Sequence, residues 1–202
     1  MVENGGIDMA KLYYIYGAMG CGKTIDLLKT AYNYEERGQN VLLFTSVVDN
    51  RYGVGKIKTR VGLERDAIVI NENMDLYTYV LKYPKRIDCI LVDEVNFLKN
   101  EHIDSLSDIV DFLDIPVMCY GLRTDFLTHT FEASKRLLEI ADSIQEMKTI
   151  CDCGKKAIIN MRISDGKIVT EGEQILVGGN ESYKSVCRRC YKDYKSRYKN
   201  SY

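Results

Sequence analysis

The chain has 202 residues, of which 46% are hydrophobic and 28% are charged, and its formal net charge is -1. This size and composition predict one globular domain, or one with a small addition, and exclude a chain that is disordered or collagen-like as a whole. A net charge near zero gives the protein no strong electrostatic attraction to nucleic acid or anionic lipid. The chain contains no run of about 18 consecutive apolar residues, so we expect no membrane span.

The start of the chain gives no sign of a secretory signal. Residues 1–10 have neither a basic start nor an apolar run, so we expect a cytoplasmic protein. This location bears on the seven cysteines, because cytoplasmic thiols stay reduced and paired cysteines then indicate a metal site before a disulfide. Cys89 and Cys119 lie within apolar runs, and we expect both to be small core residues.

Most of the chain alternates strand-like and helix-like segments. Apolar runs predict strands at residues 12–16, 41–44, 67–70, 89–92 and 117–120. Helical periodicity predicts helices at residues 23–37, 75–82, 103–113 and 131–140. Residues 51–65 are rich in glycine and basic side chains and predict a mobile loop. Continuous apolar strands separated by helices favour an α/β fold, with a parallel sheet covered by helices on both faces.

A phosphate-binding loop is predicted directly after the first strand. Residues 17–24 read Gly-Ala-Met-Gly-Cys-Gly-Lys-Thr, the Gly-x4-Gly-Lys-Thr pattern of a P-loop between a strand and a helix. The glycines let successive N–H groups turn toward a phosphate, and the start of the helix adds partial positive charge. Lys23 would reach the terminal phosphates and the Thr24 hydroxyl would bind magnesium. An ordinary glycine-rich turn is the alternative, which the strand–loop–helix context disfavours. The phosphate-site candidates are Gly17, Gly20, Cys21, Gly22, Lys23 and Thr24.

Two acidic residues close a later apolar strand in the manner of a Walker B segment. Asp93 is placed to hold the magnesium ion, and Glu94 to accept a proton from water or from a hydroxyl. An acidic strand-to-helix turn without function is the alternative, which the P-loop earlier in the chain disfavours. The basic loop at residues 51–65 is either solvated or brings an arginine to the transferred phosphate, and composition alone leaves both open.

The last third of the chain carries a candidate zinc site. Cys151, Cys153, Cys187 and Cys190 form two pairs around strand-like runs at residues 157–163 and 174–177. Four thiolates suit tetrahedral structural zinc and leave no open position for catalysis. The first pair has the tight spacing Cys-x-Cys, and free or redox-reactive thiols are the alternative. His102 and His129 are isolated, and we expect both to be surface or structural residues.

Several segments in order resemble the type II, cellular-type thymidine kinases, in a version typical of bacteria. They are Gly-Ala-Met in the P-loop, Asp-Asn-Arg-Tyr at residues 49–52, Asp-Glu-Val-Asn-Phe at 93–97, Gly-Leu-Arg-Thr-Asp-Phe at 121–126, and Val-Gly-Gly-Asn-Glu-Ser-Tyr at 177–183 before Cys-Arg-Arg-Cys-Tyr. The resemblance runs from about residue 11 to residue 194.

The resemblance implies a RecA-like P-loop domain at residues 1–150, a small zinc-binding lasso domain at 151–192 and a basic tail at 193–202. It implies transfer of the γ-phosphate of ATP to the 5′-hydroxyl of thymidine in deoxynucleotide salvage, with Mg²⁺ as catalytic and Zn²⁺ as structural cofactor. It also implies a homotetramer and feedback inhibition by thymidine triphosphate. Glu94 would be the base, and Arg51 and Asp93 would join the phosphate and magnesium site. The residues implied for thymidine are Met19, Leu122, Phe126, Phe131, Val177, Gly178 and Tyr183.

Three positions depart from the usual family pattern. Asn96 replaces a more usual glutamine, and Arg123 replaces an aspartate that many members have. Asn160 stands where many members have a threonine near the thymine methyl group, so deoxyuridine stays open as a second substrate. Two other functions fit the motifs: a P-loop nucleic-acid motor, and a regulatory nucleotide-binding protein without catalysis. The near-neutral charge disfavours the first and the intact motif residues disfavour the second.

Overall fold

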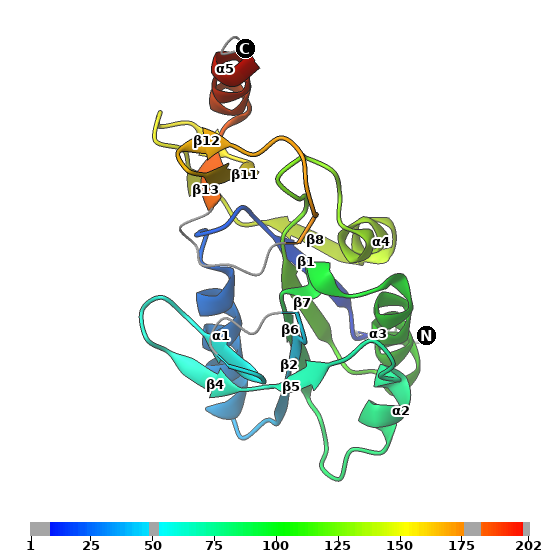
Figure 1. The fold of residues 1–202 in the computed structure, drawn as a ribbon. Helices are drawn as coiled ribbons and strands as arrows, with labels where there is room; N and C mark the ends of the chain where they lie inside the picture. The colour runs from blue at the N-terminus through cyan, green and yellow to red at the C-terminus, as the bar shows by residue number, and fades with distance from the viewer. Residues whose placement is uncertain (1–8, 49–52, 176–182, 200–202) are drawn as a thin grey trace, which may run out of the picture.

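The computed structural model describes residues 9–48, 53–175 and 183–199 (Figure 1). A central sheet of six parallel strands has the spatial order β5-β2-β6-β7-β1-β8. Its strands are β1 (Leu12–Tyr16), β2 (Val41–Ser46), β5 (Ile68–Ile70), β6 (Cys89–Asp93), β7 (Val117–Gly121) and β8 (Ser143–Glu146). All five residues of β6 are buried, as expected for a central strand with both faces covered.

Helices cover both faces of this sheet. Figure 1 shows α1 on one side and α2, α3 and α4 on the other. These helices are α1 (Lys23–Glu35), α2 (Leu76–Leu81), α3 (Asn100–Leu113) and α4 (Glu132–Ile140), with a 3-10 turn, η1 (Val95–Phe97), after β6. Two apolar cores result: Leu27 and Leu28 of α1 pack in one, and Ile103 and Leu106 of α3 in the other. The predicted α/β class is confirmed.

The five strands predicted from apolar runs occur as β1, β2, β5, β6 and β7, and the four predicted helices occur as α1 to α4. Their ends differ from the predicted ones by at most a few residues. Cys89 and Cys119 are buried core residues as predicted, and burial raises the pKa of the Cys89 thiol to about 12. His102 is buried, and its Nδ1 accepts the Lys99 N–H at the start of α3. Within the described residues, no helix combines the length and apolar character that crossing a membrane requires.

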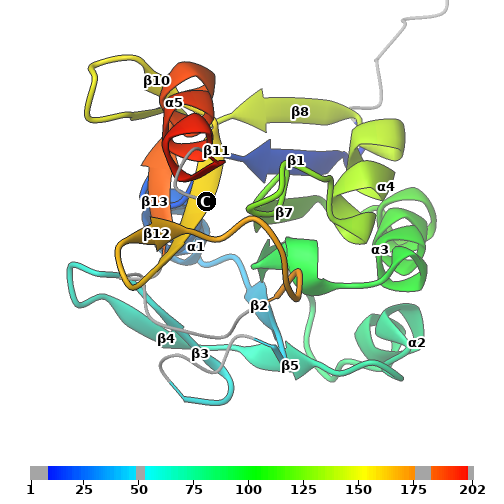
Figure 2. The same cartoon turned by 45° about the horizontal axis from the view of Figure 1, so that its top comes forward.

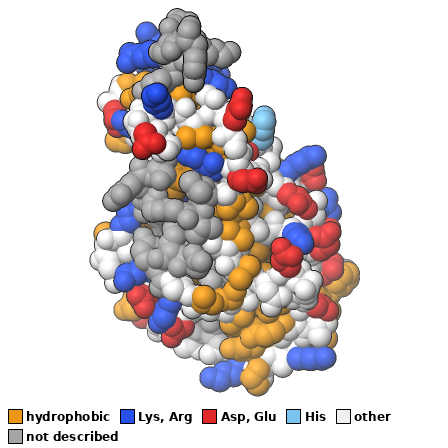
Figure 3. All heavy atoms as spheres, viewed as in Figure 1, with side chains coloured by type: hydrophobic (Ala, Val, Ile, Leu, Met, Phe, Trp, Pro, Cys, Tyr) orange, Lys and Arg blue, Asp and Glu red, His pale blue; other side chains and the backbone are white. Residues whose placement is uncertain are grey.

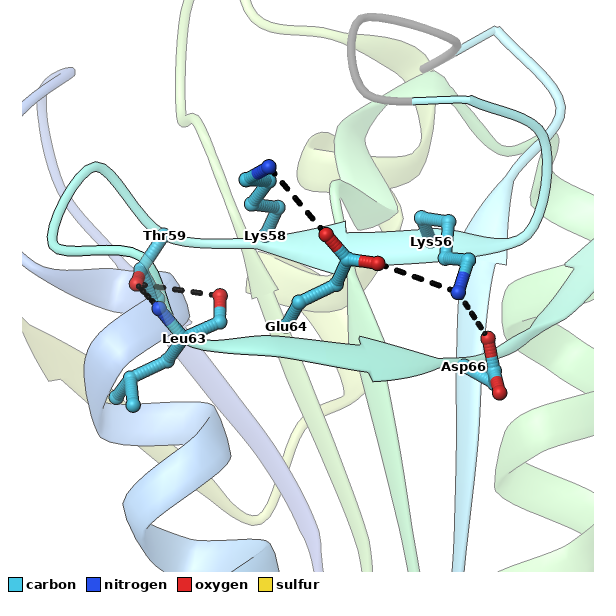
Figure 4. A network of polar contacts seen from close by, with 6 residues as sticks. All are labelled: Lys56, Lys58, Thr59, Leu63, Glu64 and Asp66. Atoms are coloured by element: carbon cyan, nitrogen blue, oxygen red, sulfur yellow. Dashed lines mark hydrogen bonds and ion pairs between the residues drawn. The ribbon is translucent and has the colours of Figure 1, made fainter.

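The prediction of a loop at residues 51–65 is wrong for its described part, which contains two strands, and the predicted mobility stays a prediction. Residues 56–66 form a hairpin of β3 (Lys56–Lys58) and β4 (Glu64–Asp66). Lys56 lies between Glu64 and Asp66, at N–O distances of 3.2 and 2.6 Å (Figure 4). Ile57, with 2% exposed surface, packs into the core beneath α1. Lys56 and Lys58 therefore form cross-strand ion pairs, and the buried Ile57 side chain anchors the hairpin on the domain.

A smaller unit of short strands and one helix follows the main sheet. It contains β9 (Thr149–Ile150), β10 (Lys156–Ala157), β11 (Ile159–Ser164), β12 (Lys167–Ile168), β13 (Tyr183–Val186) and α5 (Arg188–Lys199). Figure 2 shows this unit beside the edge of the sheet where β1 and β8 end. Helix α5 crosses the boundary predicted at residue 192, so residues 193–199 continue a helix. The run predicted at 174–177 has no strand at residues 174–175, and its remainder lies outside the described residues.

Candidate active site

The glycine-rich loop, residues 17–24, joins β1 to α1. Gly20 and Gly22 have φ angles of 75° and 90°, which glycine adopts without a steric penalty. Lys23 is only 8% exposed, and its Nζ donates to the carbonyl oxygens of Gly17 at 3.0 Å and Ala18 at 3.3 Å. The ammonium group therefore lies inside the curve of the loop, where a bound phosphate would meet it.

Position 17 requires glycine because of close packing, and not because of its backbone angle. A Cβ at this position would overlap the carbonyl oxygen of Met147 and the Sγ atom of Cys21. The chain is closely packed here because Gly17 donates to the Gly121 carbonyl at 3.3 Å and Met147 donates to the Tyr16 carbonyl at 2.7 Å. The first glycine of the motif thus lets the loop pass against two neighbouring segments.

Asp93 and Glu94 lie at the same edge of the sheet as this loop. Strand β7 separates β6 from β1, so the ends of β6 and β1 are about 10 Å apart. Asp93 is 4% exposed, and its Oδ1 accepts the Glu94 N–H at 3.0 Å. Oxygen donors such as the Asp93 carboxylate and the Thr24 hydroxyl are those that magnesium prefers, so these residues fit the expected ion.

Glu94 adopts an uncommon backbone conformation. Its φ of 49° and ψ of 39° fall in the left-handed region, which side chains other than glycine enter at a cost. The half-buried residue turns the chain from β6 into η1. Such strain is concentrated at functional sites, and its presence directly after Asp93 supports a functional role for the Glu94 carboxylate.

The backbone of Leu122 is fixed by three side chains. Its N–H donates to Oδ1 of Asn96 at 2.8 Å, and its carbonyl oxygen accepts from Tyr14 at 3.0 Å and Ser134 at 2.6 Å. Burial raises the pKa of Tyr14, which keeps its hydroxyl protonated as a donor. Asn96, Tyr14 and Ser134 were not singled out from the sequence for this role, because they come from three separate elements that only the fold brings together.

Two predicted aromatic residues lie in the segment after Leu122. Phe126 and Phe131 are both buried, and Phe131 contacts Phe97 edge to face. The guanidinium group of Arg162 in β11 lies over the Phe126 ring, and its Nε donates to the Tyr183 hydroxyl at 3.0 Å. Arg162 thereby joins two predicted nucleoside residues, Phe126 and Tyr183, across the two units of the protein.

The four predicted cysteine ligands form a compact cluster. The Sγ atoms of Cys151, Cys153, Cys187 and Cys190 all lie within 4.8 Å of one another. Tetrahedral zinc with bonds of about 2.3 Å requires sulfur atoms about 3.8 Å apart, so the donor set fits this metal. Burial alone would raise the pKa of Cys151, but hydrogen bonds from the backbone and neighbouring thiols outweigh it and lower the pKa to about 7.

Comparison with known proteins shows which family the chain is similar to. A family model described as thymidine kinase matches residues 10–191. The thymidine kinase of Streptococcus gordonii is 50% identical over 184 residues, which cover 91% of this chain and 96% of that protein. The thymidine kinase of Haemophilus influenzae is 48% identical over 188 residues, covering 92% and 97% of the two chains. That of Lactobacillus johnsonii is 50% identical over 192 residues, covering 91% and 96%.

The chain belongs to the thymidine kinase family. The predicted family and the predicted enzyme class, an ATP-dependent thymidine kinase, are thereby confirmed.

The structure brings several of the predicted site residues together from distant parts of the chain. The glycine-rich loop, Asp93 and Glu94 share the carboxyl edge of the sheet, where ligands of open parallel sheets bind. Leu122, Phe126 and Phe131 share the segment after β7, while Met19 and Tyr183 contact side chains of β11. The predicted residues Arg51, Val177 and Gly178 lie outside the described residues.

Proposed function

We propose that this member of the thymidine kinase family transfers the γ-phosphate of ATP to the 5′-hydroxyl of thymidine, with Glu94 as the general base. The observation that carries this proposal is the position of Glu94, strained and half-buried, one residue after the buried Asp93 at the edge that holds the glycine-rich loop. Phosphoryl transfer needs its nucleophile positioned and its proton accepted as the new bond forms.

The chain's own residues would divide the work as follows. The glycine-rich loop and Lys23 bind and orient the phosphates, and Arg51 adds a second positive charge. Thr24 and Asp93 would hold magnesium, which would supply positive charge beside the phosphate oxygens. Glu94 accepts the proton of the 5′-hydroxyl. The cysteine-rich unit, which consists of strands β9 to β13 and helix α5, would cover the reacting groups from one side, with zinc as a structural ion.

The nucleoside would lie between the two units. Met19, Leu122, Phe126, Phe131 and Tyr183 frame the base, together with Val177 and Gly178. The bonds that fix the Leu122 backbone support this assignment, because a fixed segment presents its side chain in one place. Deoxyuridine is a second substrate to test, because Asn160 replaces the threonine that many members have near the thymine methyl group.

The family resemblance also supports three proposals about the whole protein. We infer a homotetramer, feedback inhibition by thymidine triphosphate, and a cytoplasmic location. Light scattering of the purified protein tests the assembly, and inhibition of thymidine phosphorylation by thymidine triphosphate tests the regulation. A dimer or monomer, or turnover insensitive to thymidine triphosphate, would contradict these proposals.

One assay separates the proposed kinase from the other two candidate functions. ADP release is measured with ATP and magnesium, alone and with thymidine, deoxyuridine, other nucleosides, DNA or RNA. The kinase predicts release that depends on thymidine and equals the thymidine monophosphate formed. Stimulation by DNA or RNA alone would indicate a motor. On the face seen in Figure 3, positive and negative side chains are interspersed rather than gathered into a basic stripe, which favours the nucleoside.

A further inference from the structure

Met19, within the glycine-rich loop, is held by the cysteine-rich unit. Its N–H donates to Oδ1 of Asn160 at 2.8 Å, and the Ser185 hydroxyl donates to its carbonyl oxygen at 2.6 Å. Asn160 lies in β11 and Ser185 in β13, and the two residues are direct partners in the antiparallel register. One cross-strand pair, the Asn160–Ser185 clamp, therefore binds both backbone polar groups of Met19.

The clamp is shielded and internally connected. Asn160 is 4% exposed, and its Oδ1 lies 3.4 Å from the Ser185 hydroxyl oxygen. Hydrogen bonds in such surroundings are strong, and losing one partner leaves a polar group unsatisfied. Because the Met19 N–H is used by Asn160, it is not available to a phosphate. The clamp instead fixes the course of the loop and so the direction of the N–H groups that follow Met19.

Both strands of the clamp are anchored at the cysteine cluster. Strand β13 ends at Val186, directly before Cys187. Met161 and Val186, the neighbours of Asn160 and Ser185, point into a core that also contains Cys151 and Cys187. Alternation along a strand places Asn160 and Ser185 on the opposite face, toward the glycine-rich loop. The metal site and the clamp thus occupy two faces of one strand pair.

We propose that Asn160 and Ser185 are positioning residues that make the phosphate affinity of the glycine-rich loop depend on the metal in the four-cysteine cluster. Metal binding orders β11 and β13, the ordered pair holds Met19, and the held loop presents its N–H groups to phosphate. The inference rests on the proposed function only in assigning the glycine-rich loop to nucleotide phosphates.

The first test measures magnesium-ADP binding by titration calorimetry without thymidine, using variants whose zinc content equals that of the parent. Asn160→Leu and Ser185→Ala each remove one bond to Met19, and each should raise the dissociation constant about fivefold. Ser185→Thr keeps the hydroxyl and should stay within about twofold of the parent. Lys184→Ala, on the same strand as Ser185, is the matched control, because it removes an ion pair to Asp152 and no bond to Met19. Parent-like affinity in both clamp variants would overturn the proposal.

The second test asks whether the metal acts through the clamp. Chelation of zinc from the parent protein should weaken magnesium-ADP binding about as much as loss of both clamp residues. In the double variant Asn160→Leu/Ser185→Ala, chelation should change the affinity by less than about twofold, because the coupling is already broken. An equal further loss in the double variant would overturn the proposal. A parent protein that binds magnesium-ADP but phosphorylates no nucleoside would overturn the proposed function alone.

Discussion

The guanidinium carbon of Arg162 lies 3.8 Å from the centre of the Phe126 ring, with the Tyr183 ring on a second side at 5.4 Å. The group is 5% exposed and has neutral partners: Nε donates to the Tyr183 hydroxyl, Nη1 to the Glu173 carbonyl at 2.9 Å, and Nη2 to the Gln174 carbonyl at 3.2 Å. A planar fork of donors is suited to this geometry, and a lysine cannot reproduce it.

Arg162→Lys should therefore lower the free energy of unfolding by about 2 kcal/mol, because it breaks buried bonds to a charged donor. It should also raise the KM for thymidine about tenfold, because Phe126 and Tyr183 lose their common support, while magnesium-ADP binding stays near that of the parent. Urea denaturation and steady-state kinetics measure both effects. The control is Arg189→Lys at a largely exposed arginine, and equal effects in the two variants would contradict the assignment.

Glu94→Gln keeps the size of the side chain and removes its ability to accept a proton. We expect thymidine turnover to fall about 100-fold or more, the usual scale for loss of a general base. Nucleotide binding should persist, because Lys23, Thr24 and Asp93 are unchanged. Lys23→Ala should instead weaken nucleotide binding and turnover together. If Glu94→Gln remains within a few-fold of the parent in turnover, another group is the base.

Features that depend on short stretches of local sequence could be predicted. The glycine-rich loop and the acidic end of β6 depend on short patterns between predicted elements, so residues 17–24, Asp93 and Glu94 could be named as candidates without the fold. The cysteine cluster followed from residue type, because few other roles suit four thiols in two pairs. The order of the first elements followed from apolar runs that a parallel sheet buries.

Features that depend on distant contacts were not predictable. Strand β8 is an edge strand of the sequence Ser-Ile-Gln-Glu, with no buried residue and without the apolar run of a central strand. The hairpin of β3 and β4 has one buried apolar anchor, Ile57, among charged residues. The bond between Met19 and Asn160 joins residues 141 positions apart. Only the assembled fold places such groups together.

Zinc binding should stabilise the cysteine-rich unit, because its core is small and two of the four cysteines, Cys151 and Cys187, are buried in it. We expect one zinc per chain by elemental analysis. Cys187→Ser should reduce the zinc content and lower the melting temperature, whereas Cys119→Ser, at a buried thiol outside the cluster, should keep the zinc. A zinc-free protein with parent-like melting and an intact C-terminal unit under proteolysis would contradict a structural role.

The left-handed backbone at Glu94 predicts an unusual order of stability among variants that lack the carboxylate. Glu94→Ala and Glu94→Gly both remove the carboxylate and every side-chain atom beyond Cβ, so they lose the same base and differ in side-chain contacts only by Cβ itself. They also differ in the cost of a φ of 49°, which is about 1–2 kcal/mol for alanine and close to zero for glycine. In ordinary helical or extended positions glycine is the less stable of the two, because its unfolded chain has more freedom. Here Glu94→Gly should unfold at a higher urea concentration than Glu94→Ala, while both have equally low turnover. The reverse order of stability would show that residue 94 leaves the left-handed region in the variants. The surroundings would then not impose this backbone conformation on Glu94.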